Sequence, residues 1–223
     1  MKKNSNNEQA ILTLLLLITL LFRDKFIYLA PNLSASISLL TYSLTFLVPI
    51  LIFNKYKSKE AKKAILLSAL YVFGFYLVGA LLCTISGNLT SAVADNALKV
   101  IFAPDKFYIN NTIIHYPDLF VLAFLLIYII SHYILISVYD AINSYTNTYL
   151  GFGIALFMSF IIDTMFTVPL YHLSDIHLAN IGVIEIIKYL TANFMVVIST
   201  SLILVLSYLA LTKPKAKKKN KKD

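Results

Sequence analysis

The chain has 223 residues, of which 59% are hydrophobic and 13% charged, with a formal net charge of +8 and a mean hydropathy of +0.77. Soluble domains carry about 25% charged and about 45–50% apolar residues, so this composition excludes an ordinary soluble domain and requires lipid as a partner. The basic residues form short tracts between apolar runs and do not line an aromatic-studded face, so no nucleic-acid partner is predicted. Cys83 is the single cysteine, which excludes an intrachain disulfide framework.

Six apolar segments are long enough to cross a membrane. A transmembrane helix needs roughly 20 mostly apolar residues, and the segments that qualify are about 10–29, 36–53, 64–86, 118–139, 149–171 and 183–211. The sequence therefore predicts an all-α polytopic membrane protein, with a bundle of six transmembrane helices in residues 1–212. The remaining residues, 213–223, form a lysine-rich tail that is predicted to be disordered.

The first of these segments is interrupted by three charged residues, Arg23, Asp24 and Lys25. Two interpretations remain open. Either the three side chains snorkel and pair near the outer interface, or the helix is short and ends there.

The orientation follows from the bias of Lys and Arg toward cytoplasmic flanks. With the N-terminus inside, most basic residues fall on the cytoplasmic side, in the tracts 2–3, 55–63 and 213–222. This asymmetry predicts that both ends are cytoplasmic. Residues 87–117 are then the longest external loop, with a possible short surface helix over 92–102.

Asp163 is the outstanding candidate for function. It lies near the middle of the fifth predicted span with Ser159 and Thr164 close by, and Pro169 follows about two turns later. An ionisable group inside a span costs at least ~2.5 kcal/mol on insertion scales, so its presence indicates a substrate or ion role. The alternative is an acid that is paired with a polar side chain and only holds helices together.

Two further polar positions lie inside predicted spans. His132, in the fourth span beside Ser131, could accept a hydrogen bond from a ligand or relay a proton, or simply bond between helices. Asn193 makes the sixth span polar on part of its surface.

The sequence contains no metal-protease, hydrolase, P-loop or dinucleotide-binding signature. No catalytic residue or cofactor is therefore predicted, and the chain is not expected to be an enzyme. His172, Asp175 and His177 have a spacing that could ligate a metal, but we interpret them as a solvated loop.

Two stretches resemble the vitamin uptake transporter (VUT) family. SLLTYSLTFLVPILIFNKYKSKEAKKAILLSAL, residues 38–70, is similar to a family helix that runs into a basic cytoplasmic loop. SHYILISVYDAINSYTNTYLGFGIALFMSFIIDTMF, residues 131–166, looks like the family's fourth helix, linker and fifth helix. In the second stretch the motif positions fall on Ser159, Ile162, Asp163, Thr164 and Phe166.

The resemblance implies a transporter that imports a queuosine precursor, a deazaguanine base or nucleoside used in tRNA modification, or a similar small heterocycle. It implies a substrate site with Asp163, Thr164, Ser159, His132, Asn193 and Phe166. The chain departs from the family where polar residues are usual, at Ile50, Asn54, Leu135, Gly151 and Phe160. Phe160, Tyr128 and Tyr133 are candidates for stacking on a flat substrate ring.

Two other functions remain open at this point. One is a substrate-capture subunit that needs an energising ATPase module, as in ECF-type vitamin transporters, and the other is a non-transporting membrane paralogue. Composition and the lack of a cleavable signal indicate the cytoplasmic (inner) membrane of a bacterium, and a homo-oligomer is possible.

Overall fold

The computed structural model describes only part of the chain, and every structural statement below concerns that part. It comprises residues 5–22, 26–30, 33–36, 38–89, 99, 102, 105–109, 112–146, 148–174, 187–188, 191 and 194–203, with the side chains of the strands and of several helix ends left aside.

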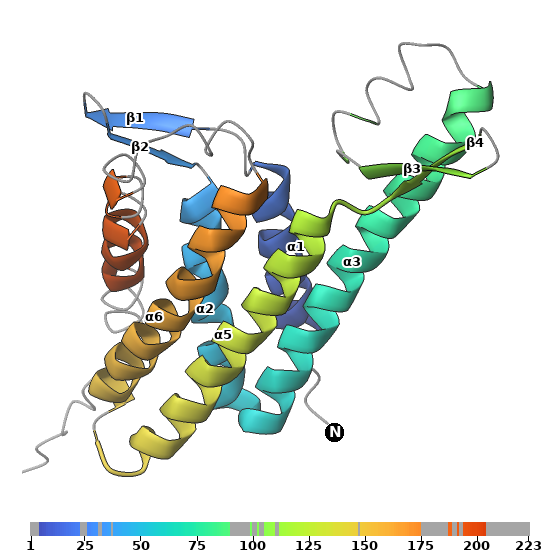
Figure 1. The fold of residues 1–223 in the computed structure, drawn as a ribbon. Coiled ribbons are helices and arrows are strands. Elements are labelled where there is room, and N and C mark those ends of the chain that lie inside the picture. The colour runs from blue at the N-terminus through green and yellow to red at the C-terminus, as the bar shows by residue number, and fades with distance from the viewer. Residues whose placement is uncertain are drawn as a thin grey trace, which may run out of the picture.

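Four helices in this part are long and apolar enough to cross a membrane, which is typical of a multi-pass helical membrane protein. They belong to α2 (Ser38–Tyr56), α3 (Ser58–Leu89), α5 (Leu119–Asn143) and α6 (Thr148–Ser174). Figure 1 shows them side by side, with α3 sloping away from the others toward one end. Four of the predicted spans are thus confirmed as apolar helices of sufficient length.

The first predicted span is shorter than 10–29. Helix α1 (Asn6–Leu21) ends just before the charged triplet that begins at Arg23, and Phe26–Ala30 is a strand, β1. Of the two interpretations of that triplet, the short helix is therefore correct.

Two antiparallel hairpins correct the expectation of a purely α-helical chain. Strand β1 pairs with β2 (Leu33–Ser36), and β3 (Asp105–Ile109) pairs with β4 (Thr112–Tyr116). Strand β1 covers residues 26–29, which were predicted to belong to the first span, so this part of the prediction is wrong. Strands β3 and β4 fall within 87–117, which was predicted as a loop.

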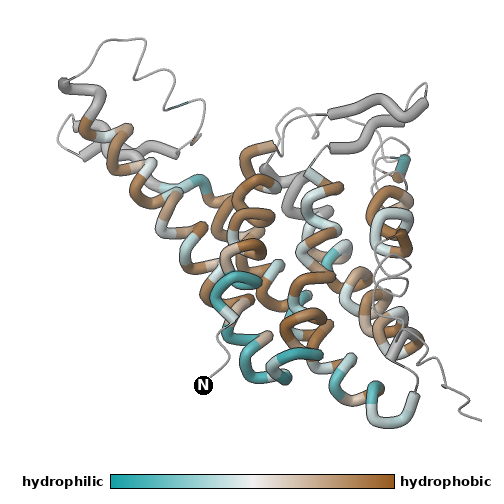
Figure 2. The backbone as a smooth tube through the Cα atoms, turned by 180° about the vertical axis from the view of Figure 1, so that it is seen from behind, coloured by the Kyte–Doolittle hydropathy of each residue, from teal (hydrophilic) through white to brown (hydrophobic). Residues whose placement is uncertain are grey.

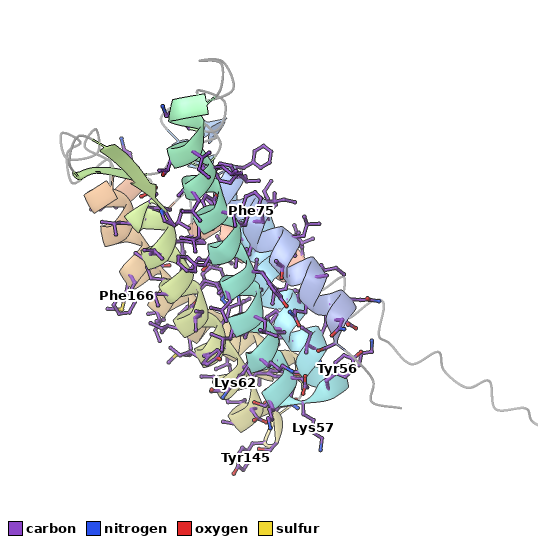
Figure 3. The ribbon with its side chains drawn as sticks, turned by 90° about the vertical axis from the view of Figure 1, so that its right-hand side faces the viewer. Tyr56, Lys57, Lys62, Phe75, Tyr145 and Phe166 are labelled. Carbon is purple, nitrogen blue, oxygen red and sulfur yellow. The ribbon has the colours of Figure 1, made fainter. Side chains whose placement is uncertain are left out.

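The two hairpins lie at one end of the bundle, and the α2–α3 and α5–α6 connections lie at the other (Figure 1). Hydrophilic residues gather at this second end, whereas the helices between the ends are mostly hydrophobic (Figure 2). Figure 3 shows Tyr56, Lys57, Lys62 and Tyr145 at the same polar end. We call it the lysine end and the other the hairpin end.

An ion pair joins α1 and α2 at the lysine end. The Lys55 ammonium lies 2.6 Å from the Glu8 carboxylate. This hydrogen bond holds the pKa of Glu8, which precedes the apolar part of α1, below its ordinary value.

The core of the bundle lies where α2 meets α1, α3, α5 and α6. Its largest fully buried side chains include Phe46, Ile50, Tyr128, Leu135 and Tyr139. Large apolar side chains are also exposed on the outer faces of the helices, as in Leu70 and Phe166. In a bilayer such faces contact lipid.

The last predicted span is seen in part. The structure describes Phe194–Ile203 as an apolar helical stretch of 10 residues, and Figure 1 places it beside α2 and α6. Of the rest of 183–211 only residues 187–188 and 191 are described, and of the surface helix predicted over 92–102 only residues 99 and 102; the tail 213–223 lies outside the described residues.

Candidate functional site

The Asp163 carboxylate is buried inside the bundle. Asp163 is 5% exposed and lies within the apolar stretch Leu150–Thr167 of α6. One carboxylate oxygen accepts a hydrogen bond from the Tyr42 phenol of α2, and the other lies 3.4 Å from the Thr167 hydroxyl. Among the described residues, no Lys or Arg pairs with it. An acid in such surroundings is held by neutral donors alone.

Helix α2 supplies the opposite wall. Tyr42, Thr45 and Phe46 are all less than 5% exposed. Positions i, i+3 and i+4 share one face of a helix, so the three side chains project together toward α5 and α6. Pro49 follows within the same helix.

His132 of α5 is fully buried and bonded on both ring nitrogens. Its Nδ1 lies 2.9 Å from the Tyr128 carbonyl, and its Nε2 lies 3.0 Å from the Thr45 hydroxyl. A carbonyl only accepts hydrogen bonds, so Nδ1 carries a proton. The Thr45 hydroxyl also lies 2.6 Å from the Tyr42 carbonyl. His132 therefore ties α5 to the turn of α2 that carries Tyr42.

Three aromatic rings from three helices form a stack. The Phe46 ring centroid lies 4.2 Å from that of His132 and 4.8 Å from that of Phe160, with interplanar angles of 28° and 20°. Tyr42 meets Phe46 edge-on, at 5.2 Å and 85°. Because Phe160 and Asp163 are three residues apart on α6, the carboxylate lies on the same helix face as one end of the stack.

Two serines complete the contact between α5 and α6. The Ser159 hydroxyl donates to the Ser131 carbonyl over 2.6 Å. The Ser131 hydroxyl lies 3.2 Å from His132 Nδ1 and donates to the Tyr128 carbonyl over 3.2 Å. We call Tyr42, Thr45, Phe46, Tyr128, Ser131, His132, Ser159, Phe160 and Asp163 the central cluster.

Hydroxyl pairs link α2 to its outer neighbours. Thr41 Oγ1 lies 2.9 Å from Thr19 Oγ1 of α1, and Thr200 Oγ1 donates to Ser43 Oγ over 2.6 Å. The adjacent Ser201 hydroxyl is buried and has no hydrogen-bond partner in the part of the chain that the structure describes. Thr41 and Ser43 are two residues apart, so these contacts lie on opposite flanks of α2, on either side of the face that meets the central cluster.

The structure brings together three of the six predicted substrate residues, Asp163, Ser159 and His132. Thr164 is half-buried on α6, and no contact places it in the central cluster. Phe166 is 54% exposed and points outward (Figure 3), so it is not part of the buried central cluster. Asn193 and the side chains of His172, Asp175 and His177, which were interpreted as a solvated loop, lie outside the described residues.

The three residues predicted to stack on a substrate ring differ in where they lie. Phe160 and Tyr128 are buried in the cluster, and the Tyr128 phenol lies 2.9 Å from the Ser68 hydroxyl. Tyr133 is half-buried, and the Lys62 ammonium lies 6.0 Å from its ring centroid. Tyr133 therefore belongs to the surface near the lysine end.

The sequence analysis did not assign Tyr42, Thr45 or Phe46 to the site. A signal was present, because Tyr42 and Thr45 are polar positions on one face of an apolar helix that leads into Pro49. Hydroxyl groups in spans commonly bond their own backbone, so this signal alone could not separate site residues from the others.

The positions that depart from the family pattern are mostly apolar and packed. Ile50, Leu135 and Phe160 are each no more than 3% exposed. Asn54 accepts a hydrogen bond from the Tyr139 phenol over 2.9 Å, and Gly151 is buried near Asn143. Among the described residues the interior thus contains one buried acid, Asp163, where the resemblance implies several.

The chemistry of this arrangement is recognition by hydrogen bonds and flat contacts. A carboxylate can accept two parallel hydrogen bonds from adjacent donors, and aromatic faces stack on planar groups. Comparison of the chain with protein-family models, with curated proteins and with solved structures finds no match.

Proposed function

We propose that the chain is a membrane transporter that imports a small planar heterocycle, with a queuosine precursor (a deazaguanine base or nucleoside) as the leading candidate. The observation that carries the proposal is the buried Asp163 carboxylate, which is held by neutral donors beside stacked rings. Ionisable residues within apolar spans mark substrate or ion pathways by default.

The chemistry of the substrate class fits these groups. A deazaguanine ring presents two adjacent N–H donors on one edge, and a carboxylate such as that of Asp163 can accept both. Stacking of a base on an aromatic side chain contributes roughly 1–3 kcal/mol, and the imidazole of His132 and the phenyl of Phe160 offer such faces. A neutral substrate needs no basic partner beside the acid.

The proposed location is the bacterial cytoplasmic membrane, with six spans and both termini inside. The positive-inside rule supports this orientation, because the lysine tract between Lys55 and Lys63 gathers at one end of the bundle. In this orientation the hairpin end is external.

Uptake in cells tests the proposal. Labelled deazaguanine precursors are supplied to bacteria that can neither make nor import them, and uptake is compared for the wild-type chain, Asp163→Asn and Asp140→Asn. Asp140 is exposed at the lysine end of α5 and serves as a matched control. We expect at least a tenfold loss for Asp163→Asn and none for the control. Equal uptake by both variants would refute the role of the buried acid.

Proteoliposomes separate transport from partner-dependent capture. Uptake by the purified chain alone supports a self-sufficient transporter. Ligand binding without uptake would instead indicate a capture subunit that requires an ATPase module. Failure of all tested heterocycles to protect the purified protein against heat would favour a non-transporting membrane protein.

A further inference from the structure

At the centre of the ring stack, a side chain of α2 fills the space between two aromatic faces; we call this space the slot. Phe46 lies between the faces of His132 and Phe160, at 4.2 and 4.8 Å between centroids. These separations are typical of stacked aromatic groups. The space between the His132 imidazole of α5 and the Phe160 ring of α6 therefore has the thickness of one aromatic ring, and the Phe46 ring of α2 fills it.

Helix α2 also contacts the polar edge of the slot, which is the Asp163 carboxylate. The Tyr42 phenol donates to the Asp163 carboxylate, and the Tyr42 ring stands edge-on to Phe46. One helix thus supplies both a flat ring between two faces and a hydrogen-bond donor to the acid. These are the two features that a planar ligand with N–H donors would bring.

We propose that Phe46 and Tyr42 occupy the binding position of a planar heterocycle, whose site has His132 and Phe160 as its faces and Asp163 as its polar edge. Binding then requires the withdrawal of both side chains by α2. This inference rests on the proposed function for the choice of ligand. The ligand class is a neutral, flat ring system with adjacent N–H donors on one edge.

The sequence of α2 suits a coupled withdrawal. Tyr42 and Phe46 are one helical turn apart, so one displacement of this part of α2 removes both. Pro49 lacks the N–H that would donate to the Thr45 carbonyl, and proline weakens a helix at that point. The segment beyond Pro49 is held separately, because Asn54 accepts from the Tyr139 phenol of α5. Helix α2 can therefore bend where the slot ends.

The direction of opening agrees with import. Helix α2 begins next to the β1–β2 hairpin and reaches the lysine end at Tyr56 (Figure 1). Tyr42 and Phe46 belong to the half that is nearer the hairpin end, which is external in the proposed orientation. A bend at Pro49 would therefore uncover the slot from outside.

Binding by purified variants gives the first arm of the test. Removing a group that competes with the ligand increases affinity, because less of the protein is held in the closed form. We expect Tyr42→Phe and Phe46→Ala each to bind 7-deazaguanine about tenfold more tightly than the wild type, as equilibrium binding in detergent measures. The matched control is Phe124→Ala, since Phe124 is buried and contacts Tyr42 but does not lie in the stack.

Labelling of Asp163 by dicyclohexylcarbodiimide gives a second arm that needs no substrate. A carboxylate oxygen adds to the central carbon, a carbodiimide nitrogen takes up a proton from water, and the adduct rearranges to an N-acylurea. We expect Phe46→Ala and Tyr42→Phe to speed this labelling at least severalfold in peptide mass spectra, with Phe124→Ala unchanged. Asp163→Asn identifies the labelled position.

The outcomes separate the two proposals. Faster labelling with no binding of 7-deazaguanine by any variant supports the closed slot and overturns the proposed substrate. Binding by the wild type that weakens in Phe46→Ala and Tyr42→Phe overturns the closed slot, because these groups would then be part of the ligand contact. Unchanged labelling in both variants overturns it as well. If Phe46→Ala does not fold, Tyr42→Phe retains its ring and decides the result.

Discussion

Replacement of His132 separates its role as a flat ring from its role as a hydrogen-bonding group. His132→Phe keeps a ring between Phe46 and Tyr128, each 4.2 Å away between centroids. It removes the 3.0 Å contact with Thr45, whose hydroxyl keeps the Tyr42 carbonyl as its partner. Interhelical hydrogen bonds in membranes contribute about 0.6 kcal/mol on average. We therefore expect His132→Phe to lower the free energy of unfolding by no more than about 1 kcal/mol.

His132→Ala should lower the free energy of unfolding much more than His132→Phe does. It loses the two ring contacts, at about 0.5–1.5 kcal/mol each. It also leaves a cavity of about 65 Å³, which adds about 1.5 kcal/mol at ~24 cal/mol per Å³. With the lost hydrogen bond the total is about 3–5 kcal/mol. Ile130→Ala, on the same helix but 47% exposed, is the control and should cost under about 1 kcal/mol.

The assay is reversible unfolding of the purified variants by sodium dodecyl sulfate in bicelles, followed by circular dichroism. Equal decreases in the free energy of unfolding for His132→Phe and His132→Ala would refute the reasoning, because the polar contacts would then outweigh the packing of the ring. Uptake adds a functional readout. We expect His132→Phe to keep most of the uptake activity, and complete loss would show that the imidazole nitrogens are needed for transport.

Three further predictions concern packing and charge. Gly79→Ala should destabilise the protein by about 1–3 kcal/mol, because an added Cβ would overlap the Phe102 ring, whereas Gly74→Ala has open space and should be neutral; unfolding of both variants checks this. Tyr128→Phe should cost only about 0.6 kcal/mol, since its serine partner keeps a backbone carbonyl, and a loss above 2 kcal/mol would contradict it. Glu8→Gln should lower the free energy of unfolding at pH 7 but not at pH 3. A carboxylate whose pKa is lowered on folding stabilises the protein above its ordinary pKa and loses this effect as the pH falls. A difference in the free energy of unfolding between wild type and variant that grows at low pH would be inconsistent with the ion pair.

Apolar runs of more than 18 residues made the spanning helices predictable. The core of each run coincides with the helix that contains it, and α5 begins at Leu119 with Asp118 as its N-cap, accepting from the Phe120 N–H. The residues at which each helix begins and ends were less predictable from the sequence. The residues after Phe26 were predicted as the end of a span and those after Asp105 as a loop, and both form hairpins, because pairing depends on a second strand.

The burial of Asp163 was predictable, because an acid in an apolar run is costly unless it faces the interior. For Phe166 the resemblance implied a position along α6 but not the direction of its side chain, which is 54% exposed.

By itself, the sequence determined that this chain has the character of a multi-pass membrane protein, where four of its long apolar helices lie, and that Asp163 lies within one of them, because these properties depend on composition along a single segment. Only the tertiary structure decided that Tyr42 caps the acid and that Phe46 fills the gap between His132 and Phe160. The partners come from different helices, α2, α5 and α6, and their rotations are set by packing against one another. Neither periodicity nor spacing within one helix contains that information.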